Sequence, residues 1–225
     1  MSHSVKGASR HVFVSGGTGY VGSRLIPRLL ERGHCVRALV RPGSESKLPP
    51  GCEPVVGDAL RSDTFSARVP PCDTFVQLVG VAHPSPAKAA QFRSIDLASA
   101  RAAGEAASAA KVAHFVYVSV AQPAPAMKDY VAARAEGEAF LKSLNLDATF
   151  LRPWYVLGPG HRWPYFLLPG YWLLERLPPT REGARRLGLV TLAQMVSALV
   201  RAVENPVRGI RIVDVPGIRA SPEGA

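Results

Sequence analysis

A glycine-rich stretch near the N-terminus constrains the fold of this chain more than any other feature. The apolar run His11–Ser15 leads into closely spaced glycines, and a segment with helical apolar spacing follows. This pattern is typical of a strand, a tight turn and a helix N-terminus, where backbone N–H groups face an anion. An ordinary strand-to-helix connection looks similar, but a second strand at the βαβ distance favours a dinucleotide site. The candidate contacts are Gly16, Thr18, Gly19, Tyr20, Val21 and Gly22.

Strand and helix patterns alternate along the rest of the chain. Strands are expected at 11–15, 35–40, 55–56, 73–80, 114–120, 148–151 and 208–215, and helices at 20–32, 62–68, 87–112, 127–143 and 191–204. Such alternation predicts an α/β fold, a doubly wound parallel sheet covered on both faces. We expect a lead-in at 1–10, one nucleotide-binding domain at 11–217 with a short cap or substrate segment at 158–190, and a tail at 218–225.

Composition and charge limit the classes of partner. The 225 residues are 47% apolar and 20% charged, which is globular composition with enough chain to bury a full core. The formal net charge of +10 favours a phosphorylated cofactor, a nucleic acid or an acidic membrane surface, unless it serves solubility alone. Because the arginines are scattered, we expect no specific nucleic-acid site.

The cysteines and the apolar runs indicate a compartment. Cys35, Cys52 and Cys72 are widely spaced and form no C-x-x-C pair, so reduced thiols are expected and a metal site is not. We find no signal-peptide pattern, and Pro169 and Gly170 interrupt the longest apolar run. We therefore expect a cytoplasmic protein without a transmembrane segment, and peripheral contact with a membrane stays open.

Arg41 follows the second expected strand, where a dinucleotide fold meets the adenosine ribose. An acidic residue there pairs with the 2′-hydroxyl of NAD, whereas an arginine suits the 2′-phosphate of NADP. No acid is near, so NADP(H) is preferred and NAD(H) is the second choice. A solvated strand end is the alternative interpretation of Arg41.

Several motifs together resemble one protein family. In chain order they are the glycine stretch, Val55-Val56-Gly57-Asp58, Phe115-Val116-Tyr117-Val118-Ser119, Tyr130-x-x-x-Arg134 with Glu136 and Glu138, and Leu151-Arg152-Pro153. On these motifs the chain resembles the atypical or extended short-chain dehydrogenase/reductases, similar to NAD(P)-binding epimerase/dehydratase-like proteins, over about residues 11–215. The resemblance implies a Rossmann fold and a nicotinamide cofactor.

The resemblance also implies cofactor contacts beyond the glycine stretch. Asp58 and Ala59 are expected at the adenine, and Gly80 and Val81 beside the adenosine ribose. Ser119 is the cofactor contact expected at the end of the fifth strand. Pro153, Trp154 and Val156, after the sixth strand, are expected near the nicotinamide.

The family's chemistry uses a tyrosine as acid and base, a lysine four residues later, and a serine or threonine after the fifth strand. This chain has Tyr130, but Arg134 stands at the lysine position and Val120 at the serine position. Residues at i and i+4 share a helix face, so the guanidinium can lie beside the phenol and the ribose. Arginine does not release its proton at working pH, however. Tyr130 and Arg134 are the candidate catalytic residues.

The segment 158–190 carries aromatic and charged residues where the family keeps its substrate lid. Candidate substrate contacts are Trp154, His161, Arg162 and Trp163. The aromatic residues suit an apolar or aromatic substrate, but a cap over the sheet or a patch for a protein or membrane fits equally. Two functions stay open: an oxidoreductase acting on a small carbonyl or apolar substrate, and a non-catalytic nucleotide-binding module that senses cofactor or supports an assembly with a protein partner.

Overall fold

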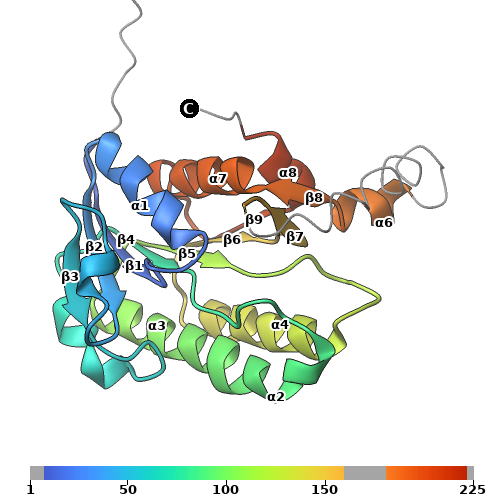
Figure 1. The fold of residues 1–225 in the computed structure, drawn as a ribbon, viewed down its shortest axis with the longest axis horizontal. Coiled ribbons are helices and arrows are strands. Elements are labelled where there is room, and N and C mark those ends of the chain that lie inside the picture. Colours follow the sequence, from blue (N-terminus) through green and yellow to red (C-terminus); the bar gives the residue numbers. More distant parts are fainter. Residues whose placement is uncertain (1–7, 160–180, 222–225) are drawn as a thin grey trace, which may run out of the picture.

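A parallel sheet of seven strands forms the centre of the protein. The structure is a computed structural model that describes residues 8–159 and 181–221 (Figure 1). The strand order is β3-β2-β1-β4-β5-β6-β9, and a separate two-stranded parallel sheet pairs β7 with β8. The strands are β1 (His11–Ser15), β2 (Cys35–Val40), β3 (Glu53–Val56), β4 (Thr74–Gln77), β5 (His114–Val118), β6 (Ala148–Leu151), β7 (Tyr155–Leu157), β8 (Leu189–Thr191) and β9 (Ile210–Val213).

Helices cover both faces of the central sheet (Figure 1). Helices α1, α7 and α8 lie on one face, and α2, α3 and α4 lie on the other. Their bounds are α1 (Gly22–Glu31), α2 (Ala89–Gln91), α3 (Ala98–Ala109), α4 (Lys128–Ser143), α6 (Arg181–Arg186), α7 (Leu192–Glu204) and α8 (Val215–Arg219). This arrangement confirms the predicted doubly wound α/β fold.

The core divides into two apolar clusters, one on each face of the sheet. Because successive strand residues point to opposite faces, Val12 and Val14 of β1 join the cluster under α1 and α7, while Phe13 joins the other. The Phe13 ring lies 5.0 Å from the Phe75 ring, which in turn lies 5.3 Å from the Phe115 ring. The aromatic row crosses β1, β4 and β5, and it packs these three neighbouring strands together in the middle of the sheet.

Several boundaries differ from the sequence-based prediction, each for a local reason. The expected helix 87–112 is interrupted by a π-helical segment, Phe92–Leu97, before α3 begins. The expected final strand stops at Val213 because the next residue, Asp214, accepts a hydrogen bond from Gly217 N at 3.0 Å and caps α8. The expected helix 62–68 forms two short 3₁₀ turns, and the three-residue strands β7 and β8 were not expected.

Helix α7 starts where its capping residues require. Thr191 accepts a hydrogen bond from Gln194 N at 3.0 Å, and the Gln194 side chain accepts one from Thr191 N at 2.9 Å. This reciprocal capping box satisfies two N–H groups at the helix start. It moves the first helical residue to Leu192, one position after the expected start.

Candidate functional site

A cavity of about 640 Å³ opens at the carboxyl ends of β1 to β4. In doubly wound sheets this edge is the usual ligand site, because the loops leaving the strands diverge there to opposite faces. All the cofactor contacts predicted between positions 16 and 81 line this cavity, and their contact with a cofactor stays a prediction. They are Gly16, Thr18, Gly19, Tyr20, Val21, Gly22, Arg41, Asp58, Ala59, Gly80 and Val81.

The glycine turn leaves β1 in a conformation that only glycines accept easily. Gly16 has φ +79°, and its carbonyl oxygen accepts a hydrogen bond from Gly19 N at 3.0 Å. A Cβ on Gly22 would overlap the Gly16 carbonyl oxygen and lie 2.7 Å from Gly17 Cα. The turn therefore packs backbone on backbone, and α1 begins without a side-chain cap at Val21. The N–H groups of Val21 and Gly22 are the donors that an anion at this edge would meet, because those of Ser23 and Arg24 already donate to the carbonyl oxygens of Gly19 and Val21.

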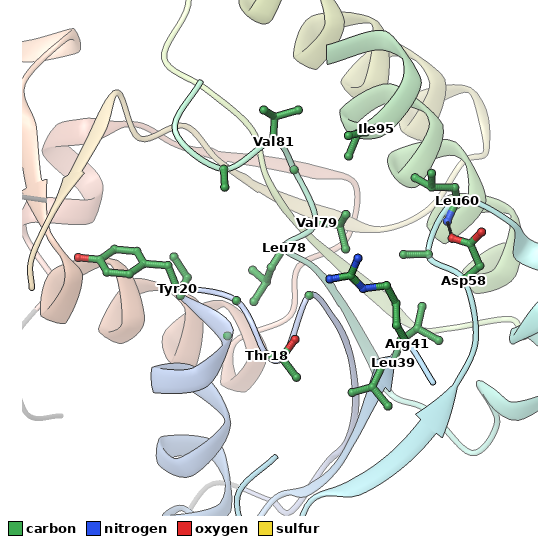
Figure 2. Close-up of a pocket in the computed structure, with 18 of the residues that line it drawn as sticks. Thr18, Tyr20, Leu39, Arg41, Asp58, Leu60, Leu78, Val79, Val81 and Ile95 are labelled. Carbon is green, nitrogen blue, oxygen red and sulfur yellow. Dashed lines mark hydrogen bonds between the residues drawn. The ribbon is translucent and has the colours of Figure 1, made fainter. Parts of the chain in front are cut away.

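Arg41, Asp58 and Leu60 gather at one end of the cavity, and Tyr20 lies towards the other (Figure 2). The Arg41 guanidinium reaches into the cavity, and within the described residues it forms no hydrogen bond or ion pair. Asp58 is held by its own loop, because its Oδ1 accepts a hydrogen bond from Leu60 N at 3.0 Å. The basic group at this end is therefore available to a ligand.

Arg37, the other arginine of this region, has a structural task. Its guanidinium donates to the carbonyl oxygens of Arg68 and Val69 at 2.7 and 2.9 Å. These bonds tie β2 to the loop before β4. Arg41 is therefore the arginine at this end of the cavity that the fold does not already use.

Sequence reasoning missed part of the cavity wall. Leu78 and Val79 form its middle between the two ends (Figure 2), and the loop that follows adds Ala82 and His83. His83 has φ +50°, and Lys88 Nζ donates to its carbonyl oxygen at 3.1 Å. These four wall residues, 78, 79, 82 and 83, follow the buried strand β4 closely in the sequence, and that position could have predicted them. The remaining unpredicted lining residues are Leu39, Val40, Gly57, Leu60 and Ile95.

The two candidate catalytic residues lie next to each other on α4. The Arg134 guanidinium carbon is 5.4 Å from the centre of the Tyr130 ring, which is half-buried against Phe92. Arg134 itself is 4% exposed, and its Nη2 lies 2.6 Å from Asp96 Oδ1. Its Nη1 donates to the Val118 carbonyl oxygen at 2.7 Å. The arginine at the lysine position is thus an interior side chain with an interior counter-ion.

The region after β5 lacks the expected hydroxyl at the serine position. Val120 and Ala121 are buried, and Ser119 before them is 2% exposed, with no hydrogen-bond partner for its Oγ among the described residues.

Burial also shifts the pKa values of two groups that contact Arg134. It raises the pKa of the Asp96 carboxyl, against the opposing effect of Arg134. Burial also raises the pKa of the Tyr117 hydroxyl.

The residues expected near the nicotinamide follow β6. Pro153 is buried, and its carbonyl oxygen accepts a hydrogen bond from Ala121 N at 3.0 Å. Trp154 and Val156 are half-buried and pack against the same apolar cluster as Tyr20. The structure therefore brings these residues towards the Tyr20 side of the sheet. His161, Arg162 and Trp163 lie outside the described residues.

Neither a membrane-spanning helix nor a metal-binding cluster occurs in the part of the chain that the structure describes. Of the helices in residues 8–159 and 181–221, none combines the length and apolar character that crossing a membrane requires. The same residues contain no group of three or more histidine, cysteine or acidic side chains able to hold a metal ion.

Comparisons with known proteins agree with this geometry. Residues 16–162 match the family model described as NAD(P)H-binding. The ceramide reductase of Caulobacter vibrioides is 26% identical over 203 residues, covering 88% of this chain and 62% of that protein. A photosystem II assembly factor of Trieres chinensis is 31% identical over 111 residues, covering 48% of this chain and 34% of the factor. The chain thus spans less than two thirds of the length of these relatives.

A solved structure extends the comparison to the fold. The enzyme WbmH of Bordetella bronchiseptica, in complex with NAD+, superposes with a TM-score of 0.68 at 22% identity, covering 92% of this chain and 76% of that one. The family match spans the glycine turn, Arg41, Asp58 and the loop after β4. The chain therefore belongs to the NAD(P)H-binding family, which supports a nicotinamide cofactor at this site.

Proposed function

We propose that the protein is an NADP(H)-dependent oxidoreductase that acts on a small carbonyl or apolar substrate. One observation carries the cofactor preference: Arg41 is the basic group at the Asp58 end of the cavity and has no internal partner among the described residues. Similarity to a protein named ceramide reductase supports a reductive step on an apolar molecule. The match covers 62% of the length of that reductase.

The residues divide the chemistry between them. A bound nicotinamide supplies hydride transfer, and this chain has to hold it and manage a proton. Tyr130 is the proposed proton donor and acceptor. The positive charge of Arg134, 5.4 Å from the centre of the Tyr130 ring, favours the phenolate form of Tyr130. Because Arg134 already contacts Asp96 and the Val118 carbonyl oxygen, we assign it a positioning role and not a direct contact with the ribose. Ser119, Pro153 and Val156 are proposed cofactor contacts, and Trp154 is a proposed substrate contact.

Turnover of a panel of ketones and aldehydes with NADPH tests this proposal. Tyr130→Phe removes the phenolic proton and keeps the ring, so we expect turnover to fall by about 10²-fold or more. Tyr117→Phe is the matched control, because the Tyr117 ring also lies beside the Arg134 guanidinium but is fully buried. Equal turnover of Tyr130→Phe and the wild type would remove Tyr130 from the mechanism.

The second candidate is a nucleotide-binding module without catalysis, which senses cofactor or supports an assembly. The buried Val120 at the serine position and the ion-paired Arg134 favour it, as does the similarity to an assembly factor. It predicts saturable NADPH binding, no turnover across the panel, and a protein that co-purifies at fixed stoichiometry. A cytoplasmic location stays a prediction.

A further inference from the structure

A buried polar network lies beside the loop that follows β4. Its centre is the pair formed by Asp96, which is fully buried, and Arg134, which is 4% exposed. Asp96 belongs to the π-helical segment before α3, and Arg134 belongs to α4. Two helical elements that are distant in the sequence therefore meet at one ion pair next to the cofactor cavity.

The pair holds the backbone of the loop directly. Asp96 Oδ2 accepts a hydrogen bond from Val81 N at 3.1 Å, and Val81 lines the cavity. A Cβ on the preceding residue, Gly80, would overlap Arg134 Nη2 and lie 2.9 Å from Asp96 Oδ1. The absence of a side chain at Gly80 thus allows the ion pair to touch the loop backbone.

The same pair reaches the next strand of the sheet. Arg134 Nη1 donates to the carbonyl oxygen of Val118, the last residue of β5, at 2.7 Å. The guanidinium carbon lies 5.6 Å from the Tyr117 ring centre and 5.4 Å from the Tyr130 ring centre. The loop after β4 and the carboxyl end of β5 are therefore linked through the Asp96–Arg134 pair.

A chain of polar contacts continues from Asp96 to the glycine turn. Ser99 Oγ donates to the Asp96 carbonyl oxygen at 3.1 Å, and Gln77 Nε2 donates to Ser99 Oγ at 3.0 Å. The Gln77 side-chain oxygen accepts a hydrogen bond from Ser15, the residue before Gly16. All these side chains are buried, so the network runs inside the protein beneath both loops of the cavity.

Stability alone is a poor explanation for this pair. A buried ion pair bears a desolvation cost that well-packed apolar side chains of similar volume avoid. The loop after β4 has neither helix nor strand between residues 78 and 85, and beyond the backbone hydrogen bond from Leu78 N to Ser15 the Asp96 side chain holds it at Val81 N. A loop that is ordered before the ligand arrives loses less conformational entropy on binding.

We propose that Asp96 is a positioning residue for the cofactor site, and that Asp96 and Arg134 form a brace that holds the Gly80–Val81 loop in its binding conformation. This inference rests on the proposed cofactor site. It gives the arginine at the lysine position a different task from the lysine it replaces: Arg134 shapes the cavity wall through Asp96. Arg134 is accordingly a positioning residue as well.

Two variants of the full chain test the brace. Asp96→Asn keeps the side-chain size and removes the charge, so hydrogen exchange in a peptide spanning residues 78–83 should become faster without ligand. The dissociation constant for NADPH should rise by about tenfold, as expected when one loop and its side chains must be ordered on binding. Asp96→Leu combined with Arg134→Met removes the acceptor of Val81 N and leaves no unpaired buried charge, so it should fold at least as stably as the single variant.

The double variant separates positioning from stability. The brace predicts that NADPH affinity stays about tenfold low even when urea unfolding shows wild-type stability. Recovery of both stability and affinity would show that the pair only supports the fold, and would overturn the proposal. Unchanged exchange at residues 78–83 in Asp96→Asn would overturn it too.

A control and a ligand-free readout complete the test. Thr149→Val breaks the buried hydrogen bond to His114 Nε2, 3.1 Å long, in the same sheet. It should lower stability without changing NADPH affinity, and an equal affinity loss there would count against the brace. If the wild type binds neither NADPH nor NADH, the proposed function fails, whereas hydrogen exchange still decides the brace.

Discussion

Replacing Arg41 by alanine should change the choice between the two nicotinamide cofactors. Arg41 is exposed at the residue after β2, and its guanidinium reaches into the cavity beside Asp58 (Figure 2). NADPH differs from NADH by one phosphate on the adenosine ribose. The variant should therefore weaken NADPH and leave NADH nearly unchanged.

The size of the effect follows from the surroundings of Arg41. A hydrogen bond to a charged group contributes about 1.5–3 kcal/mol, and solvent around an exposed side chain lowers this to about 1–2 kcal/mol. Remote arginines contribute little to the difference, because charges more than about 8 Å away are screened at physiological salt. A loss of about 1–2 kcal/mol corresponds to a dissociation constant for NADPH that is about 5- to 30-fold higher.

Calorimetric titration of both cofactors, at two salt concentrations, measures this difference. Arg28→Ala is the matched control, because it removes one positive charge from an exposed pair with Glu31 on α1 and does not line the cavity. Equal weakening of NADPH and NADH by Arg41→Ala, or equal effects of the two arginine variants, would refute the assignment of Arg41 to the phosphate.

Two further predictions concern the glycine turn and the core. Gly22→Ala should cost about 1–3 kcal/mol of unfolding free energy and abolish cofactor binding, because its Cβ would meet backbone atoms that cannot rotate away. Urea unfolding and cofactor titration measure the two effects. Gly183→Ala is the control, because a Cβ on Gly183 meets nothing within 4 Å. Burial, aided by Arg211 and Arg10 against Asp147, lowers the pKa of His114 from 6.5 to about 4. As the pH falls, the His114 imidazole therefore binds a proton in the unfolded chain before it does so in the folded chain. The free energy of unfolding should drop by up to about 3 kcal/mol as the pH falls from about 6.5 to about 4. His114→Gln, which keeps a donor for Thr149, should lose this component; an unchanged pH dependence would show that His114 does not cause it.

The glycine turn and the parallel strands could be predicted because their causes are local. A strand buried on both faces needs a run of apolar residues, as at 12–14 in β1 and 38–40 in β2, and the predicted bounds of both strands match the structure. The close approach around Gly16 and Gly22 needs residues without Cβ atoms, whatever the rest of the chain does. The place of Arg41 after the second strand, and the family resemblance for Asp58 and Gly80, predicted that the three residues meet at one edge, and they line the same cavity.

The brace could not be predicted because its parts meet only in the folded chain. Asp96 stands in an alanine-rich segment whose helical pattern gives no hint of the π-helical turn at Phe92–Leu97. The turn shifts the phase of the helix, and Asp96 lies in the interior opposite Arg134. An isolated acid in an apolar helical stretch, together with an arginine at a family's lysine position, was the available signal.

The presence of Arg134 at the family's lysine position also determines which experiment distinguishes the two proposed functions. A lysine at this position could share in proton transfer, but Arg134 keeps its proton and its charge is matched by Asp96 at 2.6 Å. The effect of that charge on the Tyr130 phenol is correspondingly reduced, so an oxidoreductase with this site must return the proton of Tyr130 from water and not through Arg134. A nucleotide-binding module needs no such proton, yet it requires the same glycine turn, Arg41 and ordered loop after β4. Cofactor affinity therefore reports on the parts that both functions share, and only turnover through Tyr130 separates them.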